Sequence, residues 1–89
     1  MKHLDIKIYG YVQGVFFRFS AQEKAQIMGI NGFVRNESDG TVYIEAEGEE
    51  DDLKQFLSWC HKGPSGARVE KVESEFSSKI KNFTDFNTY

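Results

Sequence analysis

Apolar residues in this chain switch repeatedly between the spacing of a strand and the spacing of a helix, and this succession limits the possible folds. In residues 4–8 apolar and polar side chains alternate, which is the period of a half-buried strand. Residues 20–28 then carry apolar side chains at helical spacing and are followed by Gly29, a typical helix stop. Ser20 and Glu23 have the spacing of a capping box, which predicts that the helix begins at Ser20.

The middle of the chain predicts a hairpin and a second helix. Strand patterns at residues 30–36 and 41–46 flank residues 37–40, whose Asp-Gly pair is typical of a turn. Four acidic residues at 49–52 suit the positive end of a helix, and an apolar stripe follows them. Gly63 and Pro64 are expected to end this helix.

The last third predicts two more strands. Residues 67–76 have a strand pattern, but Val69 and Val72 fall on opposite phases, so we expect a bulge or a bend there. Residues 83–89 form a weaker final strand. The order βαββαβ with a short extra strand predicts an α+β, ferredoxin-like sandwich, in which two helices cover one face of an antiparallel sheet. We expect residues 1–89 to form one domain, because a chain of this length leaves little room for a second core.

Charge and composition limit the partners. Fourteen acidic and eleven basic residues give a net charge of −3, which argues against general nucleic-acid binding. No apolar run approaches membrane-spanning length, and early charged residues argue against a signal peptide. Cys60 is the only cysteine, which fits a reducing compartment. We therefore expect a cytoplasmic monomer that binds neither nucleic acid nor membrane.

Residues 9–18, "YGYVQGVFFR", connect the first strand to the first helix. Glycine permits positive φ, so the backbone can curl and point successive N–H groups inward toward an anion. The guanidinium group of Arg18 can hold two oxygens of one phosphoryl group. No Gly-Lys-Ser/Thr follows, so this is not a Walker loop. These residues alone leave two possibilities open, a phosphate cradle and a tight turn beside a solvated arginine.

Two longer stretches resemble the signatures of a known family. Residues 8–18, "IYGYVQGVFFR", resemble the first signature of the acylphosphatase family, and residues 32–48, "GFVRNESDGTVYIEAEG", are similar to the second in residue type and spacing. The resemblance implies hydrolysis of an acyl phosphate to a carboxylate and inorganic phosphate. It implies that Arg18 binds the phosphoryl group and that Asn36 positions the attacking water. The backbone amides that it implies as further phosphate donors belong to Gln13, Gly14, Val15, Phe16 and Phe17.

Two departures from the family pattern are mild. Phe33 stands where many members have tryptophan, and this difference affects only the packing beside the site. Thr88 stands where an apolar residue is common, which weakens only the last strand. Neither departure displaces an implied functional residue.

The chemistry of an acyl phosphate fits a site that lacks an obvious catalytic acid. Neither signature contains a histidine, cysteine, aspartate or glutamate positioned as an obvious acid, base or nucleophile, apart from Glu37 and Asp39 in the expected turn. A carboxylate leaving group, whose acid has a pKa of about 4, can depart at neutral pH without being protonated. Arg18 with loop amides can stabilise the phosphoryl charge, and Asn36 can align water. Candidate metal ligands are scattered, so we expect neither a metal nor a cofactor, and we expect inorganic phosphate to bind as product and inhibitor.

Other reactive residue types have ordinary structural interpretations. His3 and His61 are isolated, and we expect them at the surface or at a helix end. Cys60 continues an apolar stripe, which predicts a buried thiol. We expect three phenylalanines to pack and hold the loop, with Phe16 able to line the mouth of a pocket: Phe16, Phe17 and Phe19.

Two alternatives to catalysis belong to other classes of protein. Ferredoxin-like sheets also serve as RNA-recognition domains, but residues 41–47 offer only Tyr43 for base stacking among several acids. A carrier or regulatory domain that binds a phosphorylated or carboxylate ligand without turnover stays open. Asn36 at its matched position favours the enzyme.

Overall fold

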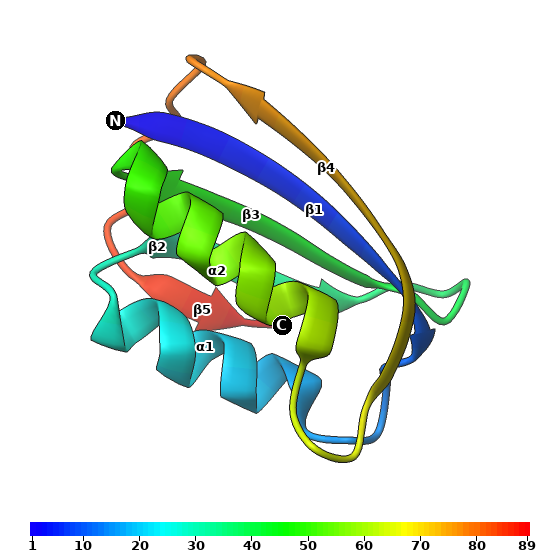
Figure 1. Ribbon diagram of the computed structural model, residues 1–89. Coiled ribbons are helices and arrows are strands. Elements are labelled where there is room, and N and C mark those ends of the chain that lie inside the picture. Colours follow the sequence, from blue (N-terminus) through cyan, green and yellow to red (C-terminus); the bar gives the residue numbers. More distant parts are fainter.

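In the computed structural model, which describes residues 1–89, two helices cover one face of a five-stranded sheet (Figure 1). The two helices lie side by side in front of the sheet, and the other face of the sheet carries no helix. In chain order the elements are β1 (Lys2–Tyr11), α1 (Phe17–Ile27), β2 (Asn31–Asn36), β3 (Val42–Gly48), α2 (Glu50–Lys62), β4 (Arg68–Ser77) and β5 (Phe86–Thr88).

The sheet has the order β4-β1-β3-β2-β5, which confirms the ferredoxin-like arrangement of the first six elements. Strands β1 to β4 pair antiparallel, whereas β5 pairs parallel with β2, so the sheet is mixed rather than wholly antiparallel. The chain leaves β4 at the end of the sheet where β2 begins, and it crosses to the far edge there. Since β5 starts at that same end, it must run in the direction of β2.

The core lies between the sheet and the helices. Alternate residues of β1 and β3 point toward the helices, as their period predicts. The fully buried members from these strands are Leu4, Ile6, Ile8, Val42, Ile44 and Ala46. Cys60 on α2 is also buried among them, and this burial raises the pKa of its thiol. The predicted core thiol is therefore confirmed.

Helix α1 begins earlier than its local pattern predicts. It starts at Phe17, directly after Phe16 with a left-handed φ of 64°, and no side chain caps its N-terminus. The Ser20 amide donates to the Phe16 carbonyl at 3.0 Å, so Ser20 lies inside the first turn and the predicted capping box is wrong. Burial of Phe17 in the core fixes the start of the helix, and this tertiary contact outweighs the local capping preference.

The predicted ends of both helices are confirmed. At the end of α1, Gly29 has a φ of 70°, its amide donates to Gln26, and the Ile30 amide donates to Ala25, which is a Schellman motif. Helix α2 carries acidic residues in its first turn and ends before Gly63. Neither helix has the length and apolar character needed to cross a membrane.

A bulge interrupts β4 where the sequence predicts one. Tyr9 pairs with Lys71 and Gly10 pairs with Val69, so Glu70 has no partner on β1. Gly10 has a φ of 129°, and a Cβ at this position would overlap the carbonyl oxygen of Arg68. The glycine at position 10 therefore serves the close approach of two strands rather than the loop that follows.

Candidate active site

A pocket of about 390 Å³ opens where β1 gives way to α1. The connecting loop, the first turns of α1, the end of β2 and the last strand all contribute to its wall. Arg18 and Asn36, which belong to two separate sequence signatures, both line this pocket. Gly14, Phe16 and Phe17 line it as well, whereas the side chains of Gln13 and Val15 do not.

The loop at the pocket presents a row of backbone donors. The N–H groups of residues 13–16 have no acceptor within the chain, and neither do those of residues 17–19 in the first turn of α1. Left-handed φ values at Gly14 (74°) and Phe16 (64°) curl this stretch of backbone. Successive unpaired amides in a curled loop at a helix N-terminus form an anion-binding concavity.

Arg18 adds a full positive charge to this concavity. It lies in the first turn of α1, and its Nη1 donates to the carbonyl oxygen of Tyr89 at 2.7 Å. One hydrogen bond to the backbone orients the guanidinium group and leaves its other N–H donors for a ligand. The arrangement suits a phosphoryl group, which accepts several hydrogen bonds from one direction.

Asn36 is the last residue of β2, and its position depends on the turn that follows. The Asp39 carboxylate accepts hydrogen bonds from the Thr41 hydroxyl at 2.6 Å and from the Thr41 amide at 3.1 Å. Lys7 lies 3.2 Å from the same carboxylate. These partners lower the pKa of Asp39 to about 2. Asp39 therefore acts as an ionised anchor of the turn, and it fixes the end of β2 beside the pocket.

Gln13 links the two signatures through its side chain. Its Nε2 donates to the carbonyl oxygen of Glu37 at 2.8 Å and to that of Thr41 at 2.9 Å. These two bonds attach the loop before α1 to the turn after β2. The Gln13 side chain thus sets the position of the loop relative to Asn36, while its backbone N–H stays in the row of free donors.

Two polar residues of the pocket were missed from the sequence. Gln22 lies one helical turn after Arg18 and donates to the Phe86 carbonyl at 2.9 Å. The spacing of four residues from Arg18 could have identified it, because such residues share a helix face. Thr88 reaches the pocket only because β5 pairs with β2, and no local signal indicates that contact.

All three phenylalanines line the pocket, but only Phe17 is also a core residue. Phe17 is buried and packs against Trp59, with ring centroids 5.4 Å apart. Phe16 is 80% exposed and lines the pocket mouth, as the sequence allowed. Phe19 also lines the pocket and is 60% exposed, so its predicted packing role is wrong. Only Phe17 falls on the buried stripe of α1, in line with Ala21 one turn later.

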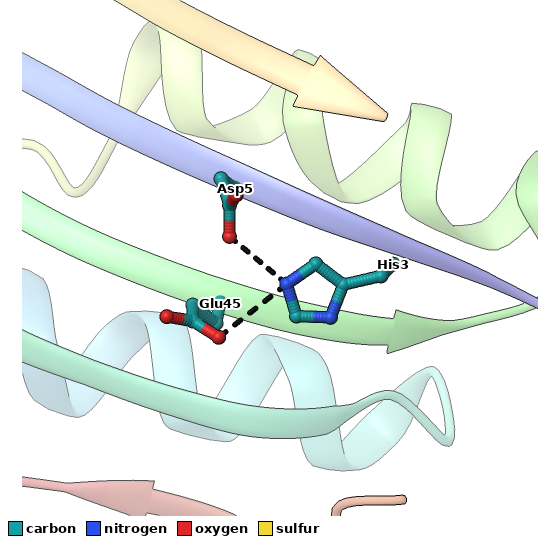
Figure 2. A group of neighbouring side chains, drawn as sticks. All are labelled: His3, Asp5 and Glu45. Atoms are coloured by element: carbon teal, nitrogen blue, oxygen red, sulfur yellow. Dashed lines mark hydrogen bonds and ion pairs between the residues drawn. The ribbon is translucent and has the colours of Figure 1, made fainter. Parts of the chain in front are cut away.

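A second polar cluster lies on the open face of the sheet, around His3 (Figure 2). His3 is only 3% exposed, so the predicted surface position is wrong. Its Nδ1 lies 2.7 Å from Glu47 and its Nε2 lies 2.9 Å from Asp5. The ring stacks near Phe83, in the segment that crosses between the two edges of the sheet. That segment covers a face that strand alternation alone predicts to be solvated.

Contacts within this cluster shift the pKa values of its members toward their charged forms. Burial alone would lower the pKa of His3, but hydrogen bonds to Glu47 and Asp5 outweigh it and raise that pKa above its ordinary value. Burial would raise the pKa of Glu45, yet hydrogen bonds from Lys81 and Tyr43 lower it. The pKa of Glu47 is lowered in the same way, against burial, by the Lys81 amide and by His3.

His61, the other histidine, occupies the helix end predicted for it. It lies in the last turn of α2, is exposed, and its Nδ1 is 3.0 Å from the Leu57 carbonyl oxygen.

Sequence comparison identifies one family over nearly the whole chain. The family model described as Acylphosphatase matches residues 4–88. An acylphosphatase from Marinobacter nauticus is 46% identical over 81 residues, which cover 91% of this chain and 88% of the relative.

Solved structures give the same result. A crystal structure of acylphosphatase from Bacillus subtilis superposes with a TM-score of 0.97 at 31% identity and covers 100% of this chain and 99% of that chain. An acylphosphatase from Coxiella burnetii superposes with a TM-score of 0.93 at 34% identity and covers 98% of this chain and 90% of that chain.

Proposed function

The chain belongs to the acylphosphatase family, and we propose that its pocket binds the phosphoryl group of an acyl phosphate through Arg18 and the loop amides, with Asn36 on the attacking water. The protein is an acylphosphatase and therefore a hydrolase. The assignment of individual residues to steps of the reaction is the part that we propose.

The row of unpaired N–H groups beside Arg18 is the observation that carries this assignment. Seven successive backbone donors, at residues 13–19, have no acceptor within the chain, although most backbone donors of a folded protein are paired. Gly14 and residues 16–19 of this run line one pocket, and Arg18 brings its guanidinium group to the same place. A tetrahedral dianion supplies the acceptors that such a set of donors lacks.

Arg18 and the amides stabilise the charge on the phosphoryl oxygens as the reaction proceeds. The water oxygen attacks phosphorus in line with the bond to the acyl oxygen, that bond breaks, and its electron pair leaves on the carboxylate. The Asn36 side-chain carbonyl can accept a hydrogen bond from the attacking water, which orients its lone pair toward phosphorus. The proton lost by the water passes to a phosphoryl oxygen of the substrate, so no protein base is required.

The acids near the pocket support a mechanism without a general acid. Asp39 is held by Thr41 and Lys7, and Glu37 lies 3.2 Å from Arg35. Neither carboxylate is among the groups that line the pocket. An alkyl phosphate ester would have to expel an alkoxide, which needs protonation, so the site favours the anhydride of a carboxylic acid.

Two exposed aromatic rings at the pocket mouth can contact the acyl group of the substrate. Phe16 and Phe19 stand on either side of Arg18 in the sequence, and both line the pocket. An acyl group attached to a phosphate held at Arg18 extends toward this rim. An aromatic acyl phosphate is therefore a suitable probe substrate, since its ring can pack against these side chains.

The decisive experiment is an assay of the purified protein with an aromatic acyl phosphate in excess chelator. We expect rapid hydrolysis that is unaffected by the chelator, and almost no hydrolysis of a simple alkyl phosphate. Inorganic phosphate should inhibit competitively and raise the melting temperature by mass action. Binding of phosphate without any turnover would instead support a carrier domain, and loss of turnover with the chelator would contradict the mechanism.

We also propose that the enzyme acts as a monomer in the cytoplasm. The single cysteine, Cys60, is buried and forms no disulfide, which suits a reducing compartment. Sedimentation at several protein concentrations tests the monomer, and a mass that rises with concentration would contradict it.

A further inference from the structure

The cluster on the open face of the sheet holds three metal-ligating atoms close together. His3 Nε2 lies 2.9 Å from Asp5 Oδ1 and 3.4 Å from Glu45 Oε1, and all three atoms lie within 4.8 Å of one another. Figure 2 shows the same ring nitrogen facing both carboxylates, one from β1 and one from β3. We propose that His3, Asp5 and Glu45 form a binding site for a divalent transition-metal cation, and that Zn²⁺ fits it best.

The spacing of the three atoms suits tetrahedral coordination. Zinc binds histidine nitrogen and carboxylate oxygen at about 2.0–2.2 Å, which places neighbouring ligand atoms about 3.3–3.5 Å apart. The distance from His3 Nε2 to Glu45, 3.4 Å, lies in this range, and the distance to Asp5, 2.9 Å, is shorter, so the Asp5 carboxylate would move outward slightly when a cation binds. Three protein ligands leave a fourth position for water, as in open zinc sites.

Glu47 supplies the outer contact that a ligating histidine needs. Because the Glu47 carboxylate can only accept, His3 Nδ1–H donates to its Oε2, at 2.7 Å. Glu47 is fixed in turn by the backbone amides of Lys81 at 2.6 Å and Phe83 at 3.2 Å. A carboxylate on one ring nitrogen directs the other ring nitrogen to a cation, which is the arrangement found around bound metals.

The charge of the cluster also favours a cation. Three carboxylates, those of Asp5, Glu45 and Glu47, lie against the His3 ring, and the Lys81 ammonium is the one lysine group paired with them. A divalent cation in place of that ammonium would offset more of the carboxylate charge, and buried charges need such partners.

Lys81 is the group that a bound cation would displace. Its Nζ lies 2.9 Å from Glu45 Oε1, at one of the proposed ligand atoms, and its side chain is 58% exposed. A lysine on a long flexible stem can leave for solvent, and the bound cation then replaces its ammonium as the charge partner of Glu45, whose side chain is only 10% exposed. The Tyr43 hydroxyl stays in contact with both carboxylates, at 3.3 Å from Asp5 and 2.8 Å from Glu45.

The site has a route from solvent. A hollow of about 340 Å³ lies against His3 and Asp5 and is bordered by Glu75 and Lys79. The Asp5 side chain is 42% exposed, whereas His3 is nearly buried. A hydrated cation can therefore approach from the Asp5 side and keep water in its remaining position.

This cation site is separate from the proposed catalytic pocket. His3 is at the start of β1 and on the open face, whereas the pocket lies beyond the end of the same strand. The ligands come from β1 and β3, and the segment that covers them contributes two amides to Glu47. A bound cation would therefore join the two strands and stabilise the fold, and this inference does not depend on the proposed reaction.

The test is Zn²⁺ binding to untagged protein near neutral pH in a buffer without phosphate. We expect calorimetry to show one saturable site and unfolding curves to show a higher melting temperature with Zn²⁺. His3→Asn and Asp5→Asn should each weaken binding on the order of 100-fold, and Glu47→Gln should weaken it about 10- to 100-fold. Co²⁺ in place of Zn²⁺ should give the intense visible absorption of a tetrahedral complex in the parent protein and lose it in His3→Asn.

His61→Gln is the matched control, since it removes the only other histidine, and it should leave Zn²⁺ affinity unchanged. Circular dichroism checks the fold of each variant. If His3→Asn does not fold, Asp5→Asn decides, because Asp5 is partly exposed and its amide analogue keeps the shape of the side chain. The absence of saturable Zn²⁺ binding to the parent protein overturns the proposal. So does binding that survives the Asp5 substitution or that disappears with His61.

Discussion

The two ends of β1 carry polar groups of opposite character. Beyond its C-terminal end, the loop and Arg18 gather hydrogen-bond donors that have no acceptor in the chain. At its N-terminal end, carboxylates gather around His3 and outnumber the positive groups. The two ends of β1 therefore carry the two sites that we propose, one for an anion and one for a cation.

The polar groups at the two ends of β1 also differ in whether they have hydrogen-bond partners within the chain. The donors at the pocket have no acceptor within the chain, so an external anion can supply one. At the other end, each buried polar side chain has a partner within the chain. Loss of a group at the pocket should therefore change function, whereas loss of a buried group at the other end should first change stability.

The largest effect is expected at the pocket, from Arg18→Ala. This change removes the full positive charge that faces the phosphoryl group, so turnover should fall by about 10³- to 10⁵-fold, the range found when an arginine that stabilises phosphoryl transfer is lost. Phosphate affinity should fall as well, because the same charge acts on bound product. Steady-state kinetics with an acyl phosphate and phosphate calorimetry measure the two effects.

Arg35→Ala is the matched control for that experiment. Arg35 is exposed on β2, one residue before Asn36, and its guanidinium lies over the rings of Phe33 and Tyr43 instead of in the pocket. The Arg35→Ala variant should keep normal turnover and normal phosphate affinity. Equal losses in both variants would mean that general positive charge, and no specific contact from Arg18, attracts the anion.

At the opposite end, Glu47→Ala should cause the second-largest effect, a loss of stability. The substitution leaves His3 and the amides of Lys81 and Phe83 without their common acceptor in a buried position. Breaking a buried charged pair in this way costs about 3–5 kcal/mol of unfolding free energy. Urea unfolding measures the loss.

Glu75→Ala provides the comparison, because Glu75 is an exposed acid on β4 near the same cluster. Its removal should change stability very little. If Glu47→Ala is as stable as Glu75→Ala, the buried network contributes nothing to stability. Glu47→Ala should still bind phosphate under conditions where it is folded, because its site of change is far from the pocket.

A smaller and more selective effect is expected from Asn36→Ala. Turnover should fall about 10²- to 10³-fold, the loss typical of one preorganised polar group, because the attacking water is no longer aligned. Phosphate affinity should be largely kept, since bound product needs no water in that position. Kinetics and phosphate calorimetry on the folded variant separate the two roles, and a normal rate would remove Asn36 from the mechanism.

Much of the fold could be predicted from local patterns. Alternation in β1 and β3 identifies their buried residues, and the phase change between Val69 and Val72 identifies the bulge at Glu70. These features follow from interactions between near neighbours in sequence. The start of α1 could not be predicted in this way, because burial of Phe17 against a distant helix outweighs the capping pattern at Ser20.

The same distinction separates the two polar regions. Arg18 and Asn36 stand in sequence stretches whose residue types resemble family signatures, and the structure places both at one pocket. His3 alternates with core residues and so predicts a solvated position, yet the segment around Phe83 folds over it. A contact made by a chain that returns from the far edge of the sheet leaves no local periodicity to detect, and Thr88 was missed for the same reason.

The smallest effect, a slight loss of stability, is expected from Asp39→Asn at the pocket end of β1. Its counterpart at the other end is the buried Glu47. Hydrogen bonds from Thr41, first from its hydroxyl and then from its amide, together with Lys7, lower the pKa of Asp39 from 3.8 to about 2. A carboxyl group whose pKa is lower in the folded state stabilises the fold above its unfolded pKa, and that stabilisation is lost as pH falls through the folded pKa. The parent protein should therefore be slightly more stable than Asp39→Asn near neutral pH, and the difference should shrink between pH 3.8 and about 2. Urea unfolding of both proteins across this range measures it. Because Asp39 is exposed, solvent screens its contacts, and a loss as large as that of Glu47→Ala would contradict the contrast between an open and a buried end of β1.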